Sequence, residues 1–158
     1  MKKTLLLAVA MIVAAFTTQE AKAVDIAVGA GFNYATCFDQ LGIGAKVQVG
    51  ITPNWRIEPE VVYYFQNRNV SDFQINCNAH YVFNITSKFS IYPFAGLSYS
   101  SWSYDYNDKT AVSRFGANIG GGIEYRIINN IGLFAEERAQ IISDFSQSMT
   151  SVGVKFHF

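Results

Sequence analysis

After its first sixteen residues the chain has no apolar run long enough to cross a membrane as a helix, although half of its residues are hydrophobic. It also lacks any cluster of Lys and Arg, which argues against a nucleic-acid partner. Only two cysteines and two histidines occur in 158 residues, and neither histidine stands at metal-ligand spacing from a cysteine or carboxylate. A chain this apolar must therefore hide its apolar side chains in a core or turn them toward lipid.

The N-terminus has the three parts of a secretory signal peptide. Lys2 and Lys3 are followed by the apolar stretch 5–16 and by the small-x-small sequence of residues 21–23. The apolar stretch is too short for the ~20 residues of a spanning helix. We therefore predict that residues 1–23 are removed after export, leaving one domain over 24–158. Removal takes away three lysines and one glutamate, which leaves nine Lys and Arg against eleven Asp and Glu.

Alternation of apolar and polar residues recurs about eight times, and no segment shows helical periodicity. This pattern predicts an all-β chain with strands near residues 26–34, 41–51, 55–66, 73–85, 91–101, 114–127, 131–142 and 149–158. The connections alternate in length. Those at Pro53, Ser87 and Asn129 are short, whereas those over 35–40, 67–71, 103–111 and 143–147 are longer and more polar. Transmembrane barrels have short periplasmic turns and longer outer loops, so we predict an eight-stranded antiparallel up-and-down transmembrane barrel.

The chemistry of the two strand faces indicates which one lies inside. One face is almost purely apolar, with aromatic residues near the strand ends, as the lipid-facing wall of a membrane barrel requires. The other carries glycines and ten charges, which we expect to pair in a narrow lumen: Lys46, Arg56, Glu58, Glu60, Arg114, Glu124, Arg126, Glu136, Arg138 and Lys155. A soluble ligand carrier would have the opposite orientation. Glu137 does not fit this division of the two faces, because its parity places a charge toward lipid, where a charge is costly. Either the residue lies near a membrane interface or a bulge shifts the register of its strand.

Several sequence segments carry a family resemblance: the signal peptide, residues 56–60, 92–97 and 120–125, and the closing Phe158. The chain resembles the small eight-stranded outer-membrane barrels known as porin-family, OmpX-like and opacity-type proteins. We expect a monomer in the lipid of a Gram-negative outer membrane. The resemblance implies insertion by the outer-membrane assembly machinery, which reads a terminal aromatic residue such as Phe158. It implies no single activity, because fold does not settle function.

Two further features could carry function. Tyr99, Trp102, Tyr104 and Tyr106 form an aromatic segment suited to binding at the cell surface, and a change of parity near Ser100 suggests a bulge or strand end there. Cys37 and Cys77 could form a disulfide in the oxidising periplasm, if their Cα atoms approach within about 7 Å.

Neither His80 nor His157 stands in a recognisable nucleophile arrangement, and nothing indicates a catalytic residue, metal or cofactor. We therefore expect a mainly structural outer-membrane protein with a lumen plugged by side chains. The alternatives are an adhesin or binding protein that acts through its outer loops, a narrow solute channel, and a lipid A-modifying enzyme centred on His80.

Overall fold

The computed structural model describes residues 25–105 and 110–158; the predicted signal peptide and Tyr106 lie outside this range. The described residues form nine strands: β1 (Ile26–Ala35), β2 (Gln40–Gly50), β3 (Trp55–Asn67), β4 (Val70–Tyr81), β5 (Phe83–Asn84), β6 (Phe89–Tyr104), β7 (Thr110–Ile128), β8 (Ile131–Ile141) and β9 (Gln147–His157). No helix in these two ranges has the length and apolar character needed to cross a membrane.

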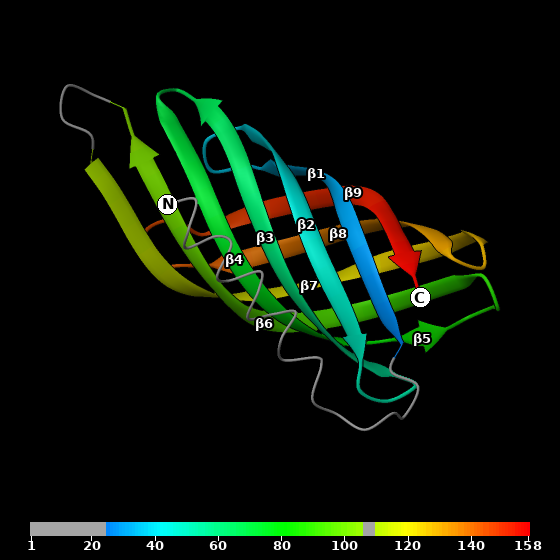
Figure 1. Cartoon of the computed structure of the whole chain (residues 1–158). Coiled ribbons are helices and arrows are strands. Elements are labelled where there is room, and N and C mark those ends of the chain that lie inside the picture. Colours follow the sequence, from blue (N-terminus) through cyan, green and yellow to red (C-terminus); the bar gives the residue numbers. More distant parts are fainter. Residues whose placement is uncertain (1–24, 106–109) are drawn as a thin grey trace.

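The strands form one closed antiparallel barrel (Figure 1). Apart from β4 and β5, strands that are neighbours in sequence pair with one another; β1 also pairs with β9, and β4 pairs with β6. The short β5 continues the line of β4 along β6 after one residue, Val82, whose N–H donates to the Asn54 carbonyl at 2.7 Å. β4 and β5 thus count as one wall strand, and the predicted eight-stranded antiparallel barrel is confirmed.

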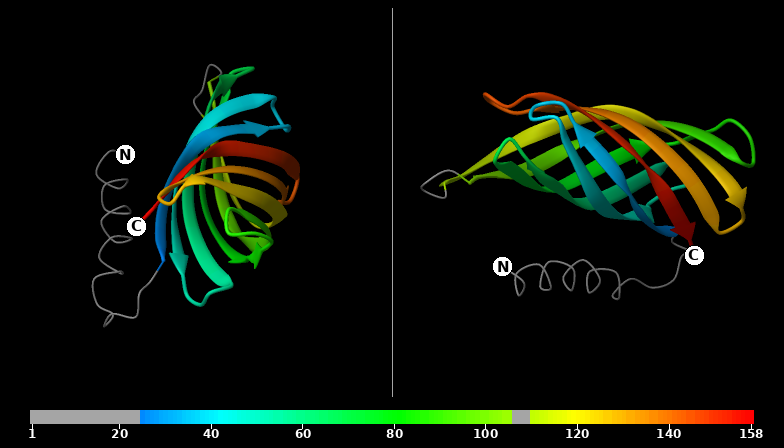
Figure 2. Two further views of the ribbon diagram at one scale, coloured as in Figure 1. Left: turned by 90° about the vertical axis from the view of Figure 1, so that its right-hand side faces the viewer. Right: turned by 90° about the horizontal axis from the view of Figure 1, so that it is seen from above.

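The two ends of the barrel differ as predicted. The C-terminus and β5 lie at one end, together with the short turns at 51–54, 85–88 and 129–130 (Figure 1). We assign this end to the periplasm, because outer-membrane barrels have their short turns there. At the other end, β6 and β7 project beyond the remaining strands (Figure 2). β6 reaches Tyr104 and β7 begins at Thr110, so both strands are longer than the sequence pattern predicts.

The side chains face the way that the sequence analysis predicts. Eight of the ten charged residues of the polar set are buried in the lumen, whereas the opposite set points outward; Phe115 is 81% exposed and Lys155 is 0% exposed. Because the ionised groups are inside and the apolar wall is outside, the soluble-carrier alternative is wrong. The outward wall is apolar enough to face acyl chains.

The predicted irregularity near Ser100 is absent from β6. Its pairing with both β4 and β7 is continuous over this stretch, and alternate residues keep to one side throughout. Trp102 therefore points into the barrel, where it stacks on Phe145 with ring centroids 4.6 Å apart. The two rings belong to a cluster with Val70 and Ile142, and Phe38 and Tyr104 pack against it. The β1–β2 and β8–β9 connections, together with the outer ends of β4 and β6, thus close the outer mouth with apolar side chains.

A glycine pair at the β1–β9 seam makes room for a ring inside the lumen. Gly31 and Gly153 are register partners, and a Cβ at either position would collide with backbone of the other strand and crowd the Phe134 ring. The Phe134 ring in turn lies under two ammonium groups, 4.4 Å from the Lys46 Nζ and 4.9 Å from the Lys155 Nζ. The small seam residues therefore help to position the central cations of the lumen.

Candidate functional site

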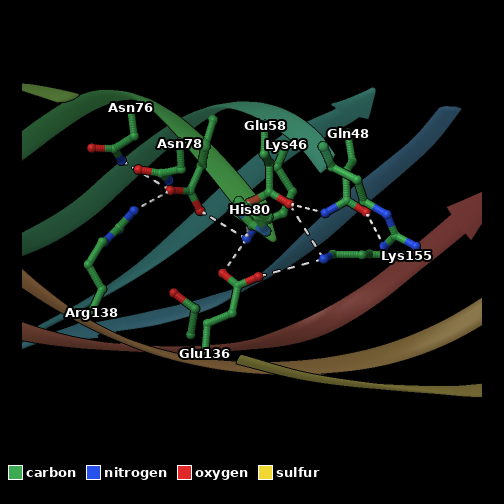
Figure 3. A network of polar contacts seen from close by, with 12 residues as sticks. Lys46, Gln48, Glu58, Asn76, Asn78, His80, Glu136, Arg138 and Lys155 are labelled. Carbon is green, nitrogen blue, oxygen red and sulfur yellow. Dashed lines mark hydrogen bonds and ion pairs between the residues drawn. The ribbon is translucent and has the colours of Figure 1, made fainter. Parts of the chain in front are cut away.

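Lys46 on β2 is the centre of an ion network inside the barrel (Figure 3). Its Nζ lies 2.6 Å from Glu136 on β8 and 2.9 Å from Glu58 on β3, with Glu60 at 3.6 Å. All four side chains are almost fully buried. The alternation of β2, β3 and β8 brings them together, because each occupies an inward position on its strand.

Uncharged and basic partners satisfy the remaining oxygens of these acids. Arg138 donates to Glu60 at 2.7 Å, and Asn76 donates to the same oxygen at 3.1 Å. Tyr92 donates to Glu136 at 2.8 Å. Since buried charges are tolerated only when paired and hydrogen-bonded, these contacts make the cluster a stable filling of the lumen.

A second group of charges lies nearer the periplasmic end, around Glu124. This carboxylate is 3.1 Å from His157 Nε2, 3.4 Å from Arg56 and 3.6 Å from Lys155. Lys155 also reaches Glu58 at 3.4 Å and Glu136 at 3.6 Å, so it links the two groups.

Asp25, just before β1, extends the second group to the end of the barrel, 3.8 Å from Arg56 and 3.9 Å from His157. The pKa of Asp25 is lowered, mainly by its hydrogen bond with His157; partial burial opposes this shift, and the charge of Arg56 adds to it.

The central network is balanced in charge. Its bases are Lys46, Arg56, Arg138 and Lys155, and its acids are Glu58, Glu60, Glu124 and Glu136. These eight belong to the ten residues that the sequence placed in the lumen, and the structure brings them together. The other two lie elsewhere. Arg126 is half-exposed at the periplasmic rim, 3.7 Å from Glu124. Arg114 is exposed near the outer end and donates to a backbone carbonyl, so its assignment to the plugged lumen is wrong.

His80 joins the network, a position that was not predicted from the sequence. Its ring stacks against Tyr92 and Phe94, with centroids 5.0 and 4.9 Å away, and its Nε2 is 3.7 Å from Glu58. The inward parity that it shares with Asn76 and Asn78 was the signal that could have placed it. Atoms of Glu58, His80 and Glu136 lie within 4.8 Å of one another, a spacing that could suit a metal ion. The ammonium of Lys46 already contacts both carboxylates, so we assign the three residues to the charge network.

The two cysteines are free thiols in the structure. Cys77 faces outward in the middle of β4, where its register partners are Pro59 and Leu97, whereas Cys37 lies in the β1–β2 connection at the outer end. The strand geometry thus separates them, and the structure does not contain the disulfide considered above. Burial, with a smaller contribution from Asp72, raises the pKa of the Cys37 thiol.

The aromatic segment considered for surface binding is divided by the alternation of β6. Trp102 is fully buried in the apolar cluster and Tyr104 packs edge-on against Phe38, whereas Tyr99 faces outward against Phe115. Tyr106 lies outside the described residues. The structure therefore does not show a single exposed binding surface made of these side chains.

Glu137 is on the outer face of β8, in regular register with Thr150 and Gly121. No bulge interrupts the strand there, so a shifted register does not explain this charge. Thr150 donates to one carboxylate oxygen at 2.6 Å, and the Ser148 hydroxyl donates to the other. Two hydroxyl donors thus replace part of the hydration that the carboxylate loses next to lipid.

The glutamates at 136 and 137 provide a matched pair for a stability experiment. Glu137→Gln removes a charge from the lipid-facing wall and should raise the free energy of unfolding by about 1 kcal/mol. Glu136→Gln leaves Lys46 and Lys155 short of a counter-charge and should lower it by about 3 kcal/mol or more. Urea titration of both variants in lipid vesicles measures these effects. A loss of stability in Glu137→Gln would show that its hydroxyl contacts outweigh the cost of the charge.

Comparison with known proteins agrees with this geometry. Residues 4–158 match the family model described as outer membrane protein beta-barrel domain. Among solved structures, the N-terminal β-barrel domain of Pseudomonas aeruginosa OprF has a TM-score of 0.74 at 19% identity, covering 85% of this chain and 97% of that one. Neisserial surface protein A has a TM-score of 0.71 at 19% identity, with 89% and 100% covered.

A third structure is Ail, the attachment invasion locus protein of Yersinia pestis, with a TM-score of 0.65 at 14% identity; 85% of this chain and 97% of that chain are covered. No curated protein sequence matches this chain significantly. The structural likenesses show the fold, and the family match covers almost the whole sequence. The chain belongs to the outer membrane protein beta-barrel domain family, and it is an integral protein of the outer membrane.

Proposed function

We propose that the protein is a closed wall protein of the outer membrane, with a structural role and without a conduction path or catalytic activity. The observation that carries this proposal is the buried, charge-balanced network around Lys46 and Lys155. An eight-stranded barrel has a lumen just wide enough for side chains, and here large polar side chains occupy it. Moving an ion through would require several tightly paired charges to separate.

The outer mouth supports the same proposal. Above the charge network, Gln74 and Gln140 join hydroxyl and amide groups in a buried polar layer, in which Gln140 donates to Ser100 at 3.2 Å. Beyond that layer lies the apolar cluster around Trp102. A solute entering from outside would have to displace both layers before it reached the ion pairs.

The enzyme alternative loses its central residue. His80 is fully buried between two aromatic rings in the lumen, whereas a lipid-modifying nucleophile system must reach the membrane surface. The adhesin alternative also loses support, because Trp102 is enclosed. Ail is an attachment invasion locus protein, but at 14% identity its likeness to this chain shows the fold alone.

The proposal includes the way the barrel is assembled. Phe158 is 77% exposed at the periplasmic end and its N–H donates to Ile26 on β1, so its aromatic ring is accessible at the seam where the barrel closes. We propose that the assembly machinery reads this residue and that the finished barrel is a monomer.

Electrical recording tests the closed lumen directly. Purified folded protein in planar bilayers should show no discrete openings, because the paired charges leave no continuous water path. A large porin reconstituted in the same way is the positive control. Discrete openings whose conductance changes in Arg138→Gln would contradict the proposal and favour the channel alternative, since a contaminant would not respond to that substitution.

A further inference from the structure

An open hollow of about 480 Å³ lies at the periplasmic end of the barrel. The β5–β6 turn and the β7–β8 turn lie side by side there (Figures 1 and 2), and the Arg126 N–H donates to the Lys88 carbonyl at 2.8 Å. Ser87, Lys88, Arg126, Ile127, Ile128 and Asn129 line the hollow. It therefore combines two cations, a hydroxyl and an amide with two apolar side chains.

The hollow has an excess of positive charge. Lys88 forms no ion pair with any residue in the described ranges, and Arg126 has only Glu124, at 3.7 Å. Glu124 is already shared with His157, Arg56 and Lys155, all of them closer. Asp25 is the other acidic side chain described near Arg126; it lies 3.8 Å from Arg56 and 3.9 Å from His157, and the charge of Arg126 contributes only a smaller attraction to it. Lys88 and Arg126 are thus available to bind an external anion.

The apolar part of the hollow faces the membrane. Ile127 is 47% exposed and Ile128 is 57% exposed, and the outward Tyr125 beside them is 50% exposed. Tyrosine at the end of a lipid-facing strand is typical of the boundary between acyl chains and headgroups. The cations therefore lie at headgroup level, and the isoleucines lie next to the acyl region.

We propose that this hollow binds the phosphate group of an anionic phospholipid in the periplasmic leaflet. Lys88 and Arg126 hold the phosphate, Asn129 and Ser87 supply neutral donors, and an acyl chain lies along Ile127 and Ile128. Arginine is suited to phosphate because its planar fork can donate two hydrogen bonds, and lysine adds a compact positive charge. The site depends on the placement of the barrel in the membrane and is independent of whether the lumen conducts.

Native mass spectrometry of the folded, full mature chain in detergent tests the site. Phosphatidylglycerol should bind about tenfold more tightly than phosphatidylcholine, and Lys88→Gln/Arg126→Gln should reduce this preference to about twofold or less. Arg68→Gln/Arg114→Gln is the matched control, because it removes the same charge from exposed arginines at the outer end. The control should keep the preference, and heat-modifiable gel migration confirms that each variant is folded.

Other outcomes would overturn the proposal. Equal binding of the two lipids by the unmodified protein, or equal loss of preference in both double variants, would mean that no specific site exists. Competition by glycerol phosphate at the same concentration as lipid would identify a soluble anion as the ligand. If the double variant does not fold, two single variants replace it. Lys88→Gln should weaken phosphatidylglycerol binding several-fold, and Ile128→Asn should weaken it without affecting the binding of glycerol phosphate. Unchanged lipid binding in both single variants would reject the site.

Discussion

Lys46→Ala is expected to lower the free energy of unfolding by about 3–5 kcal/mol, the range found when one partner of a buried ion pair is removed. Lys46 lies within 4.0 Å of three carboxylates, Glu58, Glu60 and Glu136. Without the ammonium group, these acids would repel one another in a region of low dielectric. Urea titration of the folded barrel in lipid vesicles, followed by tryptophan fluorescence, measures the loss.

The control for this substitution is Arg68→Ala. Arg68 pairs with Asp39 at 2.9 Å, close to the shortest distances in the lumen, but both side chains are exposed to solvent at the outer end. Its removal should cost at most about 1 kcal/mol, because water screens the pair. If both variants lost the same free energy of unfolding, burial would add nothing to the strength of the Lys46 contacts. That result would contradict a lumen network that is sealed from water.

A double-mutant cycle gives a sharper measure of the same contacts. Lys46→Met and Glu136→Gln remove the two ends of the 2.6 Å ion pair while keeping similar volumes. The double variant should be more stable than the sum of the single losses predicts, because each single variant leaves a buried charge that the second change removes. An additive result would show that the two side chains do not act together.

The architecture could be predicted from the sequence because one periodicity carries most of the information. In a strand, each step of two residues returns to the same face, so Lys46, Glu58 and Glu136 had to point to one side once their strands were recognised. Whether that side was inside followed from the chemistry of the opposite wall, which only lipid could accept. The strand pattern thus specifies the neighbours in the network without specifying any distance.

The errors arose where periodicity carries no information about height along the barrel. Arg114 has inward parity, but β7 continues beyond the other strands, so its side chain lies above the enclosed lumen. Trp102 falls just beyond the predicted strand 91–101, because the parity of the aromatic residues changes near Ser100. Its pairing with Asp72 on β4 and Val112 on β7 keeps it in the ladder instead. At Trp102, pairing with two neighbouring strands outweighs the local pattern.

Trp102→Ala is expected to have the other large effect, a loss of about 3–5 kcal/mol in the free energy of unfolding. The indole is fully buried and stacks on Phe145 within the cluster of Val70 and Ile142, so its removal leaves a cavity at the outer mouth. The cluster also fixes the β8–β9 connection, since Phe145 belongs to residues 142–146. The variant should therefore become sensitive to protease at this connection on intact cells, before the barrel unfolds.

Trp55→Ala is the matched control for both measurements. Trp55 is 47% exposed at the opposite end of the barrel, where its ring contacts Tyr81 at 5.1 Å. Losing one partly exposed aromatic pair should cost only about 1 kcal/mol and should leave the outer connections protected. If both tryptophan variants lost the same stability, or if Trp102→Ala remained resistant to protease, the aromatic cluster would not be what closes the outer mouth. Vesicle unfolding and limited proteolysis of whole cells together separate these outcomes, because the first reports on the whole barrel and the second on a single connection.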